Sequence, residues 1–156
     1  TYTDPSLLCL VSEVAAATGS LEAAESLWDR LQPKRDHWVS WGLFGMTVEG
    51  PVSRILALLA SSLGRSGQAE RHFEKALDQA RALGAGPMVS RTAYEYAEHL
   101  IRAGEADRKD HVSELLGEAA QIAERIGQSG LLELIRVVNE GVPVETSDTA
   151  GVPSVE

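Results

Sequence analysis

Apolar residues recur at intervals of three and four along most of the chain, a spacing that places them on one face of an α-helix. Segment 66–83 keeps this spacing almost without interruption, and Gly84 follows it at a place where glycine commonly ends a helix. The combination of an apolar stripe and a terminating Gly or Pro recurs along the chain. It predicts seven helices, over residues 5–18, 21–31, 51–63, 66–83, 87–103, 112–126 and 131–139.

The predicted helices also repeat one another in sequence. Shifting the chain by 43 residues places Phe73 on Leu116, and shifting it by 45 places Trp28 on Phe73. A period of this length with two helices per unit is typical of an α-solenoid. We therefore predict an all-α fold, an α-α superhelix (solenoid) of about three helical hairpins with a capping helix. Its parts are hairpins 5–32, 51–84 and 87–127, a connector 33–50 and a cap 130–139, which form one domain over 5–139.

Residues 33–50, the connector, interrupt the helical pattern. They hold three glycines and the aromatic residues Trp38, Trp41 and Phe44, and strand-like alternation is confined to 37–49. Such a connector either fills the groove between two helical hairpins or lines a pocket, because aromatic side chains often line ligand pockets. The sequence leaves both interpretations open.

Composition excludes several classes of partner. The 156 residues carry 14 basic against 23 acidic groups, a net charge of -9, which repels a phosphate backbone or an anionic membrane. No apolar run approaches the roughly 20 residues of a bilayer span, and no basic region precedes the first apolar stretch as in a signal peptide. One cysteine fits a reducing compartment, so we expect a cytoplasmic protein. Residues 140–156 are expected to form an acidic tail or linker.

Motifs for catalysis and metal binding are missing from the sequence. The four histidines lack the spacings that arrange metal ligands, and His72 and His99 are expected to be solvated or to pack. No Gly-x-Ser-x-Gly turn occurs, and Cys9 lies in an apolar stripe, as an inert small residue does. We expect no metal site, no cofactor and no enzyme activity. An acid-base site of Glu13, Tyr94 and Glu98 is the weakest alternative.

Part of the chain resembles the tetratricopeptide repeat. That family's pattern is a Gly at the turn between two helices, then an Ala, an aromatic residue and a second Ala. It is met by Gly64, Ala69, Phe73 and Ala76, and in part by Gly19, Ala24 and Trp28. The predicted helices are longer than in the standard repeat, and its usual Trp and Gly in the first helix are missing.

Over roughly residues 5–135, the chain is similar to the C-terminal helical-repeat region of large bacterial signalling ATPases, which include LuxR-type transcriptional regulators and adenylate cyclases. No phosphate-loop motif or basic helix-turn-helix is present. The resemblance therefore implies a sensor or interaction region whose output domain lies elsewhere or is absent.

The resemblance also implies where a partner binds, because the first helix of each tetratricopeptide pair lines the groove. The matching positions are Cys9, Glu13, Ala17, Arg54, Leu58, Ser61, Arg91, Tyr94, Glu98, Ile101 and Arg102. From these we expect partner contacts by Glu13, Arg54, Arg91, Tyr94, Glu98 and Arg102.

Three of these residues, Arg54, Arg91 and Arg102, are expected to form a fork-shaped basic patch that holds a carboxylate. The competing interpretation is that Arg91 and Arg102 only pair with Glu95 and Glu98 on the helix surface.

The favoured function is that of a non-catalytic interaction or regulatory module of a bacterial signalling or transcriptional regulator. Its expected partner is a protein or peptide, with homo-oligomerisation as a further option. The alternative is a small-molecule sensor that holds an inducer between Trp38, Trp41 and Phe44 of the connector and the concave face.

Overall fold

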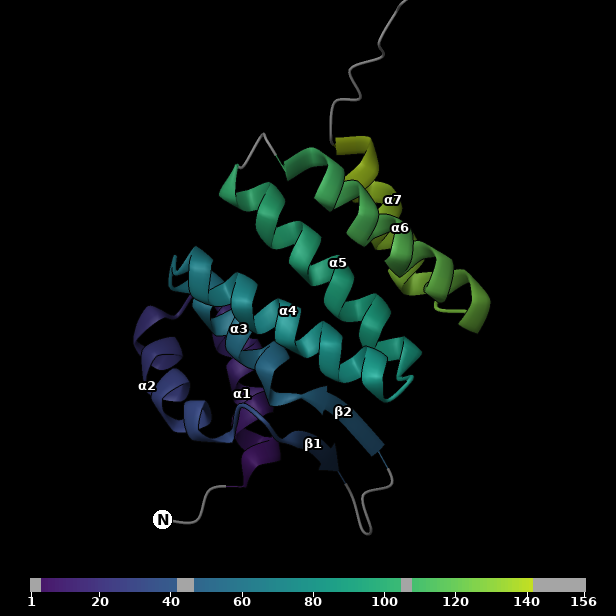
Figure 1. The fold of residues 1–156 in the computed structure, drawn as a ribbon. Helices are drawn as coiled ribbons and strands as arrows, with labels where there is room; N and C mark the ends of the chain where they lie inside the picture. The colour runs from purple at the N-terminus through teal and green to yellow at the C-terminus, as the bar shows by residue number, and fades with distance from the viewer. Residues whose placement is uncertain (1–3, 42–46, 105–107, 142–156) are drawn as a thin grey trace, which may run out of the picture.

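The fold is predominantly helical, as the periodicity predicts. A computed structural model of the chain describes residues 4–41, 47–104 and 108–141. Within these ranges the helices are α1 (Pro5–Thr18), α2 (Leu21–Leu31), α3 (Val52–Ser62), α4 (Ser66–Ala82), α5 (Gly86–Ala103), α6 (Lys109–Ile126) and α7 (Ser129–Gly141), as Figure 1 shows. Two short strands, β1 (Trp38–Trp41) and β2 (Thr47–Pro51), and a 3-10 turn (Gln32–Lys34) complete the described elements.

Local sequence explains most helix ends. The Asp4 side chain accepts a hydrogen bond from the Ser6 amide at 2.8 Å, and Pro5 occupies the first turn of α1, where its missing N–H costs nothing. Gly19 ends α1 with φ at 69°, a left-handed conformation that few residues other than glycine adopt. Pro51 departs from the expectation: it is extended and pairs in β2, so α3 begins one residue later.

The helices pack in consecutive antiparallel pairs. α1 packs on α2, α3 on α4, and α5 on α6. The first helices of these pairs also follow one another, since α3 contacts both α1 and α5, and α7 contacts α5 and α6. Figure 1 shows this progression from the pair α1–α2 at one end to α7 at the other. α7 runs two residues past the expected end of the cap, and the rest of the predicted tail, 142–156, lies outside the described residues.

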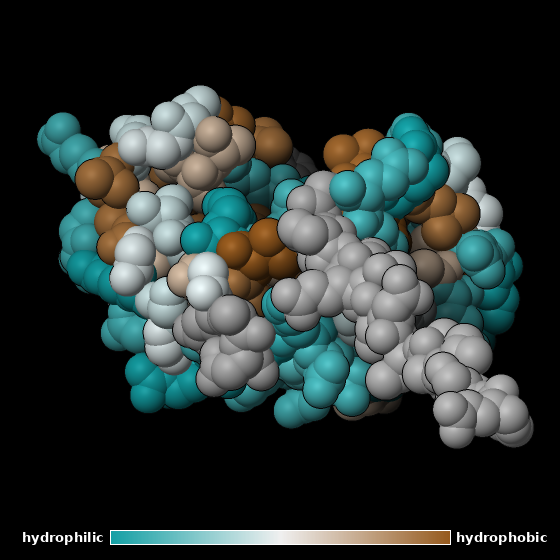
Figure 2. All heavy atoms as spheres, turned by 90° about the horizontal axis from the view of Figure 1, so that it is seen from above, coloured by the Kyte–Doolittle hydropathy of each residue, from teal (hydrophilic) through white to brown (hydrophobic). Residues whose placement is uncertain are grey.

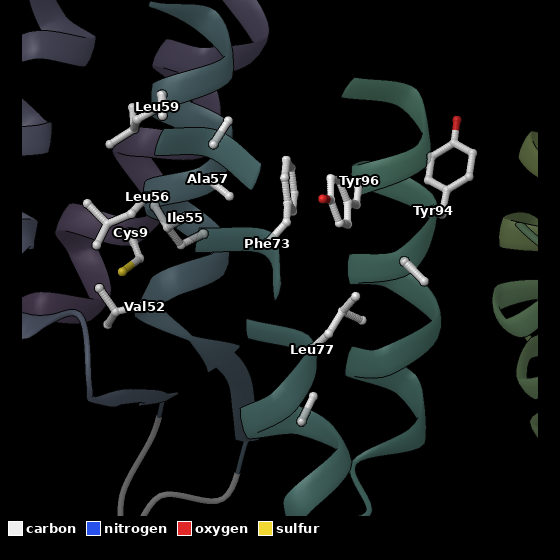
Figure 3. Packing of buried hydrophobic residues seen from close by; sticks show 14 of the residues in the cluster. Cys9, Val52, Ile55, Leu56, Ala57, Leu59, Phe73, Leu77, Tyr94 and Tyr96 are labelled. Carbon is white, nitrogen blue, oxygen red and sulfur yellow. The ribbon is translucent and has the colours of Figure 1, made fainter. Parts of the chain in front are cut away.

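Small residues at the repeated positions let neighbouring helices approach closely. The alanines that recur in the second helix of each pair are fully buried, namely Ala24, Ala69, Ala76 and Ala119. Between α4 and α5, Phe73 stacks on Tyr96 with ring centroids 5.1 Å apart. Figure 3 shows this pair, and it shows Cys9 of α1 beside Val52 and Leu56 of α3. One continuous core therefore extends through the successive helix pairs.

The connector contains an antiparallel β-hairpin, in the only part of the sequence with strand-like alternation. Trp38 pairs with Pro51 and Ser40 with Val48, with an irregularity after Val39. The Ser6 hydroxyl donates to the Ser40 carbonyl oxygen at 3.1 Å, so the hairpin is joined to α1. β1 contacts α1, and β2 contacts α3 and α4, which places the hairpin across the first two helix pairs.

Candidate functional site

A hollow of about 260 Å³ lies between α1, α3 and α5. Its described lining residues all come from the first helix of a pair: Glu13, Ala16 and Ala17 from α1, Arg54, Leu58 and Ser62 from α3, and Arg91, Glu95, Glu98 and Arg102 from α5. Three arginines and three glutamates therefore converge in one place. Their opposite charges balance, so the hollow as a whole is not basic.

Arg54 lies at the centre of this cluster and is only 1% exposed. Its Nε and Nη2 atoms donate to the two carboxylate oxygens of Glu95 at 2.7 and 2.6 Å, and Nη1 donates to Glu13 at 2.6 Å. Burial opposes the charge of Arg54, but Glu95 and Glu13 outweigh it and raise the pKa of the guanidinium. One side chain of α3 thus joins α1 to α5 through a bidentate and a single charged hydrogen bond.

Arg91 approaches the same two carboxylates from the rim of the hollow. Its Nε lies 3.2 Å from Glu95 Oε1, and its Nη2 lies 3.4 Å from Glu13 Oε2. The Arg91 side chain is 42% exposed, in contrast to Arg54. Arg102, which is also exposed, donates through Nε to the Glu98 carbonyl oxygen at 3.3 Å.

The structure brings together five of the six residues predicted for partner contact. Glu13, Arg54, Arg91, Glu98 and Arg102 all line the hollow, whereas Tyr94 is not among its lining residues. Figure 3 shows Tyr94 and Tyr96 pointing to different sides of α5, with Tyr96 toward α4. Tyr94 and Glu95 are adjacent in α5, so their side chains point about 100° apart around the helix.

The expected basic patch needs a correction. Arg54 is enclosed and bound to two carboxylates, so it does not present its charge to solvent. The competing interpretation is met in part: Arg91 pairs with Glu95, but Arg102 contacts the backbone oxygen of Glu98 and not its carboxylate. Of the arginines that line the hollow, Arg102, which is exposed, and Arg91, whose side chain is 42% exposed, remain accessible to solvent.

Glu95 is the residue whose main partner sequence reasoning missed: its pair with Arg91 was suggested and is observed, but its bidentate pair with Arg54 was not suggested. A signal was available in the repeat. When Gly64 and Gly104 are aligned, Glu95 falls on Ile55, an apolar residue that is buried. An acidic residue at a position that is apolar in the neighbouring repeat indicates a charge facing inward, which requires a cationic partner.

The connector residues predicted for the alternative ligand pocket do not all fall in the described part. Trp38 is partly buried against the core and is not among the lining residues of the hollow. The side chain of Trp41 and the whole of Phe44 lie outside the described residues.

Cys9 and His99 are both buried. Burial, followed by the charges of Glu13 and Glu49, raises the pKa of the Cys9 thiol to about 12, which keeps it protonated and unreactive. His99 packs near Phe73, and its Nδ1 lies 2.8 Å from the Ser61 hydroxyl. Of the two expected roles for His99, packing and not solvation is the one observed. Among the described residues, no group of three His, Cys, Asp or Glu side chains is arranged to hold a metal ion.

Comparison of the chain with protein-family models, with curated proteins and with solved structures finds no significant match. Within the described ranges, no helix has both the length and the apolar character that crossing a membrane requires.

Proposed function

We propose that this chain is a non-catalytic, tetratricopeptide-like module that binds a segment of a partner protein in the hollow between α1, α3 and α5. The proposal extends to its context, a cytoplasmic bacterial signalling or transcriptional regulator, through the resemblance of the repeat sequence. The observation that carries the proposal is the convergence of charged side chains from the first helices of three successive pairs.

The charge distribution indicates which part of a partner fits. Arg54 is occupied internally, so the groups that meet a ligand are Arg91 and Arg102 at the rim. A carboxylate of the partner is the group that both guanidinium groups bind best. Leu58 and Ala17, which also line the hollow, offer apolar contact beside it. An extended peptide with an acidic residue next to an apolar residue matches this arrangement.

The sensor alternative has weaker support. It requires the inducer to lie between the connector and the concave face, whereas the described lining residues come from three helices. We therefore favour the peptide.

The proposal is tested with fluorescein-labelled octapeptides of random sequence in which one central position is fixed as Asp or Glu. A matched pool has Asn or Gln at that position. Fluorescence anisotropy should show saturable binding of the acidic pool and at least tenfold weaker binding of the amide pool, because a hydrogen bond to a charged group contributes about 1.5–3 kcal/mol.

Substitutions locate the binding surface. R91E/R102E should abolish binding of the acidic pool, and the milder R91Q/R102Q should weaken it at least tenfold. The control R71E/R125E makes the same charge change at exposed positions of α4 and α6 and should bind as the parent does. Equal binding by R91Q/R102Q and the parent, or no preference of the parent for the acidic pool, contradicts the proposal.

A further inference from the structure

The hollow extends to the end of the molecule at which the chain leaves α7. Its lining reaches the last turns of three helices, at Ala17 of α1, Ser62 of α3 and Arg102 of α5. α7 contacts α5 and follows the antiparallel α6, so α5 and α7 run in the same direction. Figure 1 shows both helices ending toward the upper side, with the end of α7 in yellow. Figure 2 views the molecule from that side, where mostly hydrophilic residues surround smaller apolar patches.

The tail segment, residues 142–156, is long enough to reach the hollow. It lies outside the described residues and follows α7, which ends at Gly141. Fifteen residues of extended chain span up to about 50 Å. Neighbouring helices lie about 8–10 Å apart, so two helix spacings, roughly 20 Å, separate α7 from the hollow beyond α5. Less than half of the tail segment covers this distance, and the rest is available for binding.

The sequence of the tail segment matches the peptide proposed for the hollow. It carries Glu145, Asp148 and Glu156 and no basic residue. Val144 precedes Glu145, and Val155 precedes Glu156, so an acidic residue follows an apolar one twice. A carboxylate suits the accessible guanidinium groups of the hollow, and a valine beside it suits the apolar part of the lining. Length, point of departure and charge therefore favour the same occupant.

We propose that the tail segment binds in the hollow of its own chain and competes there with the acidic segment of a partner. This inference rests on the proposed function, because it assigns a second occupant to the same site. A tethered segment has an effective concentration on the order of 1 mM, so a tail segment with a dissociation constant of that order occupies about half of the hollows. The tail segment thereby weakens the binding of every partner and sets the affinity that a partner must exceed.

Binding of the fluorescein-labelled acidic pool to the whole chain tests the competition. The variant E145Q/D148N/E156Q, called the tail variant, keeps the length of the chain and removes the three carboxylates of the tail segment. It should bind the acidic pool about twofold more tightly than the parent, or better, because the internal competitor is lost. Affinity equal to that of the parent contradicts the proposal.

A matched control makes the same charge change away from the hollow. D29N/D78N/E124Q neutralises exposed carboxylates of α2, α4 and α6, helices that contribute no described lining residue. This control should bind the acidic pool as the parent does. An equal gain in affinity by the control and the tail variant overturns the proposal, because reduced repulsion by the net charge then accounts for both.

Paramagnetic relaxation enhancement tests the contact directly. Cys9 is buried and its pKa is raised to about 12, so a nitroxide reagent should label the introduced thiol of A150C selectively. The nitroxide should broaden the backbone amide signals of Glu13 and Ala17 in α1, on the side of the hollow away from α7. The same label in the tail variant should leave these signals sharp. Broadening between spin-labelled and nitrogen-15-labelled chains in a mixture overturns the proposal, because the tail segment then binds a second copy.

This inference and the proposed function fail in different ways. Suppose that the parent prefers the acidic pool and that R91Q/R102Q loses this preference. If the tail variant then binds as the parent does and α1 shows no broadening, the hollow binds a partner without the tail segment, and only this inference is overturned. If the tail variant also fails to prefer the acidic pool over the amide pool, the proposed function is overturned, and this inference with it.

Discussion

Replacing Arg54 tests whether the buried ion-pair cluster joins three helices. Arg54→Met keeps most of the alkyl chain and removes the guanidinium, so packing changes little while the charge and three donors are lost. Glu95 and Glu13 then face each other at the base of the hollow. Their side chains are 13% and 23% exposed, so water compensates only part of the loss.

The expected loss of unfolding free energy is about 3 kcal/mol. Removing one partner of a buried ion pair costs about 3–5 kcal/mol, because the remaining charge is left uncompensated. The lower end applies here, since Arg91 still lies 3.2 Å from Glu95 and 3.4 Å from Glu13. For a chain of this length, the melting temperature should fall by roughly 6–12 °C.

Urea unfolding followed by circular dichroism measures this loss. R54M/E13Q/E95Q, which removes the stranded charges together with Arg54, should recover at least half of the stability, because a neutral replacement of the whole cluster costs little. Arg71→Met, at an exposed position of α4, should stay within about 0.5 kcal/mol of the parent. The reasoning fails if R54M loses less than about 1 kcal/mol, or if the triple variant is as unstable as R54M.

Two further predictions concern pH and backbone conformation. Burial raises the pKa of the Cys9 thiol and of the Tyr96 phenol to about 12 in the folded chain. The unfolded chain therefore releases these protons at lower pH than the folded chain does, and the free energy of unfolding should decline as pH rises above about 9. Tyr96→Phe should reduce the decline between pH 9 and pH 11 by about 1 kcal/mol in urea unfolding, and an unchanged decline contradicts this. Gly50 has φ at 128°, and an added Cβ would lie 2.9 Å from Met88 Sδ, so Gly50→Ala should lower the melting temperature more than Gly64→Ala, where φ is 69° and the space is open. Equal melting temperatures of the two variants would refute that argument.

Periodicity was sufficient to predict the helices, because most of them bury one main apolar stripe and most are followed by a glycine in the left-handed conformation. The 3.6-residue pattern, the buried alanines and Gly19 act within one helix or between neighbours, and such local signals are readable from sequence. The structure of the connector was harder to predict from the sequence. Its hairpin has a period of two over only a few residues, and the hydrogen bond from Ser6 to Ser40 joins positions that no local pattern relates.

The ion pairs of the hollow show the same limit of prediction from local sequence. The spacing of four between Arg91 and Glu95 correctly indicated an ion pair, but the stronger partner of Glu95 is 41 residues away in α3. Helix propensity and residue spacing describe one helix at a time, whereas the partners of Arg54 lie on the two helices packed on either side of α3. Aligning the repeats recovers part of this information, because it shows which face of each helix meets its neighbour.

The position of Arg54 bears on how the hollow would act on a partner. Arg54 of α3 is bound to Glu13 of α1 and to Glu95 of α5, so one side chain links the first helices of three successive pairs. A carboxylate that binds Arg91 competes with Glu13 and Glu95 for the same guanidinium. Both carboxylates keep their hydrogen bonds to Arg54 when Arg91 turns to a ligand, and the one negative charge that Arg54 does not balance lies on side chains that are 23% and 13% exposed to water. Arg54 thereby leaves the partly exposed Arg91 available, which supports the proposal that the charge-balanced hollow binds an acidic partner.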